Sequence, residues 1–175
     1  CPTEDKINLL LLGRGIEKKK CNILAKMSQG NIGLAIELNE NYDLIPKDIK
    51  IIFEAFFKEN PPFMQQFQLR LQELNRSGNK ELFDNYFQLQ VQLIRDLILL
   101  KLDQNSIQIV FSHLKEKYFE IITDNPKADF HSMLEAIDDA YRMHLGNVNP
   151  SLNSISLIFD IQACLEGKEY QSINK

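Results

Sequence analysis

The sequence predicts an all-α fold, in which a small three-helix bundle precedes a larger antiparallel helical domain of about six helices. Apolar residues recur at helical spacing in most segments, as in Ile49, Ile52, Phe53, Phe56 and Phe57. Alternating apolar and polar residues, which are typical of strands, are nearly absent. Prolines, glycines and good capping residues separate the apolar segments, where helices are expected to begin and end. The fold class follows from these three observations.

We expect residues 1–43 to form the small three-helix bundle. We expect its helices to cover about 4–12, 16–27 and 31–40. Thr3 is placed to cap the first of them, because a threonine hydroxyl can accept a bond from a free N–H group of the first turn. Asn41-Tyr42-Asp43 is the expected linker to the second domain.

We expect residues 44–175 to form the larger domain, which contains the longer helices. These are expected over about 46–57, 61–75, 80–102, 106–123, 130–145 and 150–165. The helix over 80–102 is apolar almost all round at its centre, which predicts a buried core helix. Prolines at the first helical turn and capping residues mark the helix starts, namely Pro46, Pro61, Pro150, Asn60, Asn79, Asp129 and Asn149.

Composition excludes several classes of protein. The chain has 175 residues and a net charge of −4, whereas a protein that relies on nonspecific phosphate contacts is usually basic. Cys1, Cys21 and Cys164 are scattered, which fits reduced thiols and a cytoplasmic protein. No apolar run reaches the roughly 18 residues of a membrane span. The chain begins at Cys1 without a methionine, so we expect a fragment of a longer protein.

Few residues are candidates for chemistry. The sequence has no phosphate-binding loop, zinc-protease or nucleophile-elbow motif. His113, His131 and His144 lack partners at the spacing of known ligand sets, although His131 and Glu135 share a helix face. We interpret that face as solvated and the phenylalanines as core. We therefore predict no catalytic residue, no cofactor and no metal site in this chain.

Two segments resemble one family. In the first, Gly30, Asn31, Gly33 and Ala35 form a Gly-x-x-Gly-x-Ala turn between two short helices. The second is Asn147-Val148-Asn149-Pro150-Ser151-Leu152, followed by an aliphatic helix. Their order and separation resemble the delta-prime subunits of bacterial DNA polymerase III clamp loaders, which belong to the AAA+ clamp-loader family. The resemblance covers the whole chain loosely and about 25 residues specifically.

The resemblance implies a role in DNA replication without catalysis. Residues 1–43 would be the small helical lid of an AAA+ module, and 44–175 the collar through which subunits assemble. Gly33 stands where motor subunits carry an arginine that reaches ATP phosphate, and glycine offers neither its charge nor its donors. The family thus implies a stator-like, non-ATPase subunit of a DNA-directed DNA polymerase (nucleotidyltransferase) holoenzyme.

The resemblance also implies partners. The collar would bind the gamma/tau motor and delta subunits, and through them act on the sliding clamp and primed DNA, with no membrane contact. Asn147, Asn149, Pro150 and Leu152 are the residues expected near a subunit interface. Three alternatives remain open: the same region of the gamma/tau motor subunit, a generic helical protein-interaction domain, and a small helical enzyme without a recognisable motif.

Overall fold

The computed structural model describes residues 3–146, 148–168 and 170–172. Within these residues it contains nine α-helices and no strand, which confirms the all-α prediction. The helices are α1 (Glu4–Gly13), α2 (Lys18–Ser28), α3 (Ile32–Glu40), α4 (Ile45–Phe57), α5 (Pro61–Ser77), α6 (Lys80–Leu102), α7 (Lys115–Asp124), α8 (Phe130–Leu145) and α9 (Pro150–Leu165). Two 3-10 turns, η1 (Tyr42–Leu44) and η2 (Ser112–Leu114), precede α4 and α7.

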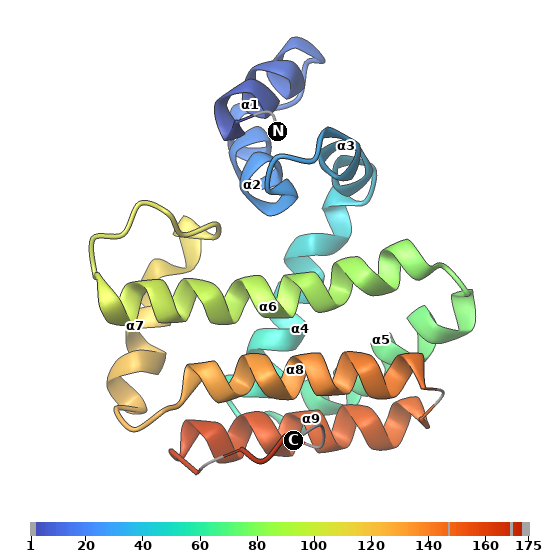
Figure 1. The fold of residues 1–175 in the computed structure, drawn as a ribbon, viewed down its shortest axis with the longest axis vertical. Helices are drawn as coiled ribbons and strands as arrows, with labels where there is room; N and C mark the ends of the chain where they lie inside the picture. The colour runs from blue at the N-terminus through green and yellow to red at the C-terminus, as the bar shows by residue number, and fades with distance from the viewer. Residues whose placement is uncertain (1–2, 147, 169, 173–175) are drawn as a thin grey trace.

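Helices α1, α2 and α3 form one end of the molecule, which we call the three-helix unit (Figure 1). They are packed around their own apolar cluster, to which each helix contributes buried side chains. Its members are Ile7, Leu11, Cys21, Leu24, Ala25, Ala35 and Leu38. Each helix is too short to be stable alone, so this shared burial holds the unit together.

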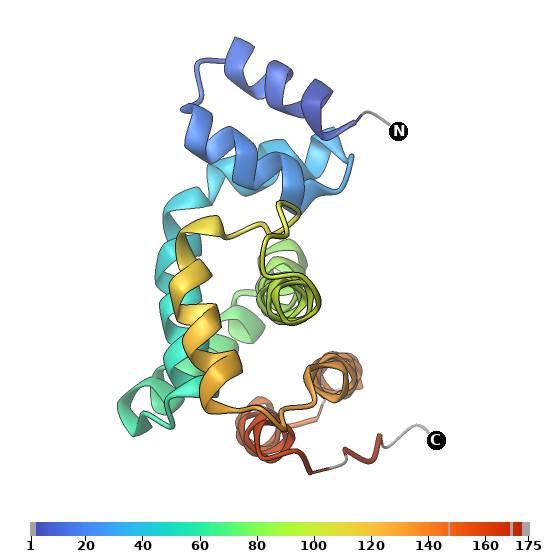
Figure 2. The same ribbon diagram turned by 90° about the vertical axis from the view of Figure 1, so that its left-hand side faces the viewer.

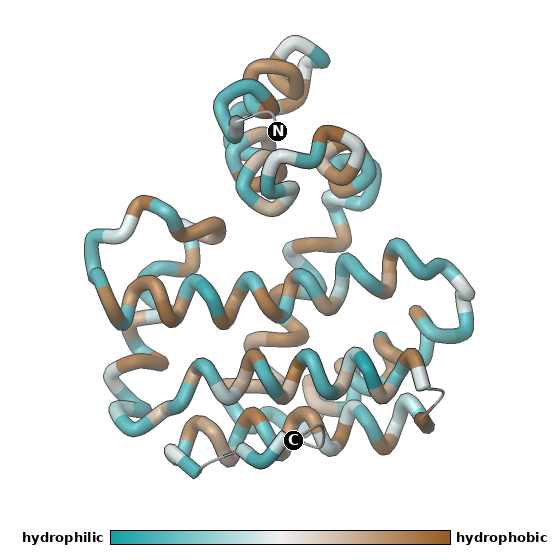
Figure 3. Tube along the Cα trace, viewed as in Figure 1, coloured by the Kyte–Doolittle hydropathy of each residue, from teal (hydrophilic) through white to brown (hydrophobic). Residues whose placement is uncertain are grey.

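Helices α4 to α9 form a larger body around a second and much larger apolar cluster, which runs from Ile45 to Leu165. In Figures 1 and 2, α6, α8 and α9 lie side by side, whereas α4 and α7 run across them. α8 and α9 are antiparallel neighbours joined by a short connection. Along these helices apolar residues recur about once per helical turn, with polar residues between them (Figure 3). This spacing gives a helix an apolar face that packs into the core.

The long helix α6 is the centre of the body. Its buried side chains include Phe87, Leu93, Ile94 and Leu97, and its bounds are those predicted from the sequence. The phenylalanines of α4 are also core residues, as predicted, and Phe56 packs against Phe67 of α5 with ring centroids 5.2 Å apart. The body therefore has a complete core of its own.

Most predicted caps are formed, and two are not. Asn79, a predicted cap, accepts a bond from the Leu82 N–H, and Asn31, which was not predicted as a cap, accepts one from the Leu34 N–H, in each case the third residue of the helix, at 3.1 Å. Thr3 precedes α1 and Asn60 precedes α5, but neither side chain makes a capping bond. Asn60 instead donates to Glu54 Oε2 at 3.3 Å. A competing side-chain partner replaces the local cap there.

The helix predicted over 106–123 is wrong in its first half. A loop covers residues 103–111, and α7 begins only at Lys115. The buried Asp96 carboxylate of α6 accepts bonds from the backbone N–H groups of Val110 and Phe111, at 3.0 and 2.9 Å. These bonds replace those that a helix would have supplied to the same N–H groups. The burial of both side chains in the core also holds the loop in place.

Candidate functional site

The Gly30 turn lies between α2 and α3 and is formed by backbone conformation. Gln29 takes the left-handed conformation with φ of 47°, and Gly30 follows with φ of 92°. Asn31 then caps α3. A glycine suits this position because other residues rarely adopt such a φ value. The tight start of α3 that the sequence predicts is therefore present.

Gly33 itself has no tertiary packing role. A Cβ atom built there would meet only Asn31 Oδ1 within 4 Å, at 3.3 Å. The close backbone approach that two glycines suggested is thus not found at Gly33, which lies on the surface. Ala35, two residues later, is fully buried in the three-helix unit. The structure leaves the Gly33 position open to solvent.

The start of α9 has the local geometry that the second motif predicts. Asn149 accepts a bond from the Ser151 backbone N–H at 2.9 Å, and Pro150 is the first helical residue. The Gln72 side chain of α5 donates to Ser151 Oγ, so this end of α9 is tied to α5. Asn147 lies outside the described residues.

Leu152 begins an exposed apolar stripe on α9. Leu152, Ile155 and Phe159 follow one another at helical spacing, and their side chains are 64%, 37% and 58% exposed. A groove of about 290 Å³ lies beside the stripe, between α9 and α5. Its lining includes Ile155, Phe159, Pro61 and Met64. We call Leu152, Ile155 and Phe159 the α9 stripe.

The opposite face of α9 already fills the core. Leu157, Ile158 and Ile161 are 1%, 1% and 0% exposed. Asn153 is also buried and donates to the Ala140 carbonyl of α8 at 2.7 Å. Because the core face of α9 is complete, the stripe is apolar surface beyond what the fold of this chain uses.

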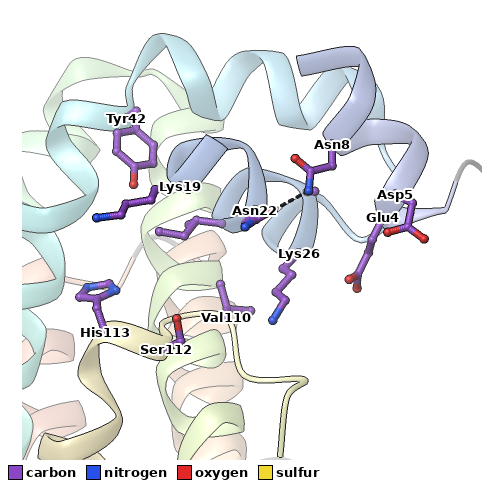
Figure 4. Close-up of a pocket in the computed structure, with 12 residues that line it drawn as sticks. Glu4, Asp5, Asn8, Lys19, Asn22, Lys26, Tyr42, Val110, Ser112 and His113 are labelled. Atoms are coloured by element: carbon purple, nitrogen blue, oxygen red, sulfur yellow. Dashed lines mark hydrogen bonds between the residues drawn. The ribbon is translucent and has the colours of Figure 1, made fainter. Parts of the chain in front are cut away.

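A second hollow separates the three-helix unit from the body. This cavity of about 730 Å³ lies between α1, α2 and the segment around η2 (Figure 4). Its polar lining is Glu4, Asp5, Asn8, Lys19, Asn22, Lys26, Tyr42, Ser112 and His113. A cavity of this size is where a small enzyme would bind its substrate. The side chains that line the cavity therefore show whether it could be an active site.

Four of the polar groups of this cavity, Lys26, Asn8, Asn22 and His113, are held by structural contacts. Lys26 Nζ donates to the carbonyl oxygens of Ile107 and Ile109 at 2.9 and 2.6 Å. Asn8 donates to Asn22. Burial and the nearby Lys117 ammonium lower the pKa of His113, whose ring packs edge-on against Phe111. Ser112 and His113 are neighbours in this lining, which the structure describes in full, but no hydrogen bond joins the Ser112 hydroxyl to the His113 ring, so the serine has no base to activate it.

Two other perturbed groups lie inside the body, away from this cavity. Arg70 forms two hydrogen bonds with Asp48, at 3.0 and 3.1 Å, and burial raises the pKa of the Asp48 carboxyl. Burial raises the pKa of the Cys164 thiol to about 11, which keeps it protonated near neutral pH. Across the part of the chain that the structure describes, no three His, Cys, Asp or Glu side chains gather in a way that could hold a metal ion.

The two sequence motifs do not form one site in the structure. The Gly30 turn and the α9 stripe lie on different parts of the molecule, one on the three-helix unit and one on the body. His144 stacks on Phe83 with ring centroids 3.6 Å apart, a packing role that no local pattern indicated. Phe159 was also missed as a surface residue, because its helical spacing from Leu152 and Ile155 would equally fit a face buried in the core.

Comparisons with protein-family models, with curated protein sequences and with solved structures found no match to this chain. None of the described helices combines the length and the apolar character needed to cross a lipid bilayer. The function must therefore be argued from the chain's own surfaces and from the motifs of its sequence.

Proposed function

We propose that the chain is a non-ATPase, stator-like subunit of a clamp loader, of the delta-prime kind. In this proposal the three-helix unit and its linker (1–43) are the lid, and the body (44–175) is the collar. The chain would assemble with motor and delta subunits to load a sliding clamp on primed DNA, while other subunits hydrolyse ATP. It would contribute binding surface and no catalytic residue.

The α9 stripe is the observation that carries the proposal. A subunit that assembles through its helices needs an apolar face left over after its own core is filled, with polar residues around it. Leu152 and Phe159 supply such a face, and Gln65 and Gln68 border the same groove. The occupant we propose is a helix of a neighbouring collar, because a groove between two helices accommodates a third.

Gly33 favours the stator role over the motor role. The position is exposed, and a Cβ atom there would meet only Asn31 Oδ1, at 3.3 Å, so no packing against another helix requires glycine. A motor subunit would use the position for a cation that contacts ATP phosphate. The glycine therefore supports a subunit that does not sense ATP through its lid.

A generic helical interaction domain is the second candidate, and the same stripe favours it. The two candidates differ in the partner. A clamp-loader subunit should bind motor and delta subunits, whereas a generic adaptor has no reason to select them. The cavity beside Lys26 offers less support for an enzyme, because its lysine and asparagine groups are already bonded to the protein.

The test is complex formation with motor and delta subunits, followed by size-exclusion chromatography at micromolar concentration. We expect one stable complex with the natural chain. The double substitution Leu152→Gln and Phe159→Gln should weaken association at least about tenfold, because central apolar contacts dominate such interfaces. Leu102→Gln is the matched control, since Leu102 is as exposed but lies at the end of α6, outside the stripe.

Two results would contradict the proposal. If the natural chain elutes alone, it is not a clamp-loader subunit of this kind. If the Leu102 variant and the double variant lose the partners equally, the complex forms through another surface.

A further inference from the structure

The loop over 103–111 lies between the body and the three-helix unit and contacts both. In Figures 1 and 2 it rises from the end of α6 to the side of α2. α6 holds it through Asp96, and α2 holds it through Lys26. The covalent chain joins the two parts elsewhere, through η1 and the start of α4. The loop is therefore a second, noncovalent connection.

The body end of the loop is a buried anchor. Asp96 has no exposed surface, and its carboxylate accepts from the backbone N–H groups of Val110 and Phe111. Gln92 and Tyr118 donate to the same carboxylate, at 3.2 and 3.4 Å. A buried carboxylate that lost these donors would remain in the core without compensation, so this end is costly to release.

The other end of the loop is an exposed latch. The Lys26 ammonium donates to the carbonyl oxygens of Ile107 and Ile109. The loop is thus held at one end by a cation that binds its carbonyl groups and at the other by an anion that binds its N–H groups. The contact with Ile107 is exposed to solvent. Water can replace such a bond at little cost, which makes this end the easier one to open.

One further polar contact joins the two parts. Asn85 of α6 donates to Glu37 Oε1 of α3 at 2.6 Å. Met27 and Tyr42 also pack against the apolar clusters on both sides, and Ile23 packs against the cluster of the body. Met27 lies with Leu44 and Ile45 beside the covalent connection, whereas the loop reaches α2 at Lys26. Opening of the latch alone would thus leave the three-helix unit attached at one side and free to turn.

We propose that the 103–111 loop is a strap, anchored in the body by Asp96 and latched to α2 by Lys26, which sets the orientation of the three-helix unit. When Lys26 releases the Ile107 and Ile109 carbonyls, the unit turns about the η1 connection while the loop stays on the body. This inference concerns the chain by itself and does not depend on the proposed clamp-loader role.

The test compares Lys26→Met with Lys19→Met in the whole chain. Lys19 lies on the same helix and lines the same cavity, but it makes no hydrogen bond with the strap among the described residues. Spin labels on cysteines at the exposed positions Lys6 and Glu135, in a Cys1→Ser background, report the distance between the two parts. The other native cysteines are buried and inaccessible to the label.

We expect a broader or shifted distance distribution for Lys26→Met, and the natural distribution for Lys19→Met. Amide exchange at Val110 and Phe111 should stay within about twofold of the natural chain in Lys26→Met, because the anchor remains. In Asp96→Asn at least one of these two amides should exchange about tenfold faster, because asparagine offers one neutral acceptor oxygen in place of the two charged oxygens of the carboxylate.

Identical distance distributions for the Lys26 and Lys19 variants would overturn the latch. Unprotected Val110 and Phe111 amides in the natural chain, measured against core amides of α6, would overturn the anchor. This second measurement needs no substitution, so the anchor can be tested even where Asp96→Asn does not fold.

Discussion

At the residue scale, single polar side chains decide where helices begin and loops settle. Asp129 precedes α8 and accepts bonds from the backbone N–H groups of His131 and Ser132, at 3.1 and 3.0 Å. The Ser132 hydroxyl adds a third bond at 2.8 Å. The sequence predicted this cap, because an aspartate before an amphipathic run has a defined local partner. It could not predict Asp96, whose partners lie 14 and 15 residues away.

Substitution of Asp129 should show the stability of the cap and its dependence on pH. The bonds from Ser132 lower the pKa of the Asp129 carboxyl. The stability it contributes is therefore complete above the unfolded value of about 3.9 and is lost as the pH falls through the folded pKa. We expect Asp129→Ala to cost about 1 kcal/mol near neutral pH, measured by urea unfolding.

Asp129→Asn is the matched control, because asparagine also caps but does not titrate. The free-energy difference between the natural chain and the asparagine variant should shrink as the pH falls below about 4. A difference that stays constant over this range would show that the charge of the carboxylate contributes nothing to the cap.

At the element scale, α9 shows how one helix can serve both a core and a free surface. Ile158 is 1% exposed and Phe159 is 58% exposed, although they are adjacent in the sequence. The helical turn places them about 100° apart, so one faces α5 and α8 and the other faces outward. The sequence predicted the helix and its start, but both residues are apolar, and only the packing of neighbouring helices distinguishes them.

Substitution of these two neighbours should have very different costs. Ile158→Ala should lower the free energy of unfolding by about 2–5 kcal/mol, because it leaves a cavity in a packed core. Phe159→Gln should cost about 1 kcal/mol or less, since most of its ring is already in water. Chemical unfolding followed by circular dichroism measures both, and equal costs would mean that Phe159 belongs to the core.

At the scale of the whole molecule, the two apolar clusters differ greatly in size. The three-helix unit has a small cluster around Ile7 and Leu24, whereas the body has one that draws on six helices. A small core buries less apolar surface and stabilises less. The Lys26 strap and the Glu37 contact join the parts with few polar bonds. We therefore expect the unit to open before the body unfolds.

Native-state hydrogen exchange tests this expectation. Amides of α1 to α3 should exchange with a lower opening free energy than amides at the centre of α6. Ile7→Ala, which removes a fully buried side chain of the small cluster, should speed exchange in α1 to α3 only. The corresponding core substitution in the body, Ile52→Ala, should speed exchange at the centre of α6 but not in α1 to α3, because the unit opens while the body is still folded. One opening free energy throughout would show a single cooperative unit.

The sequence by itself determined the fold class, the bounds of α6, α8 and α9, and the caps at Asn79, Asp129 and Asn149. These features depend on helical spacing and on bonds within a few residues, which are local properties of the chain. The lid, the collar and the replication role remain proposals that rest on two short motifs.

Only the tertiary structure decided which apolar residues stay on the surface and where the 103–111 loop lies. The α9 stripe and the Asp96 anchor depend on helices that are distant in sequence, so no window of neighbouring residues contains them. The helix expected from 106 fails for this reason, because a buried carboxylate on α6 accepts the N–H groups that local spacing assigned to a helical turn.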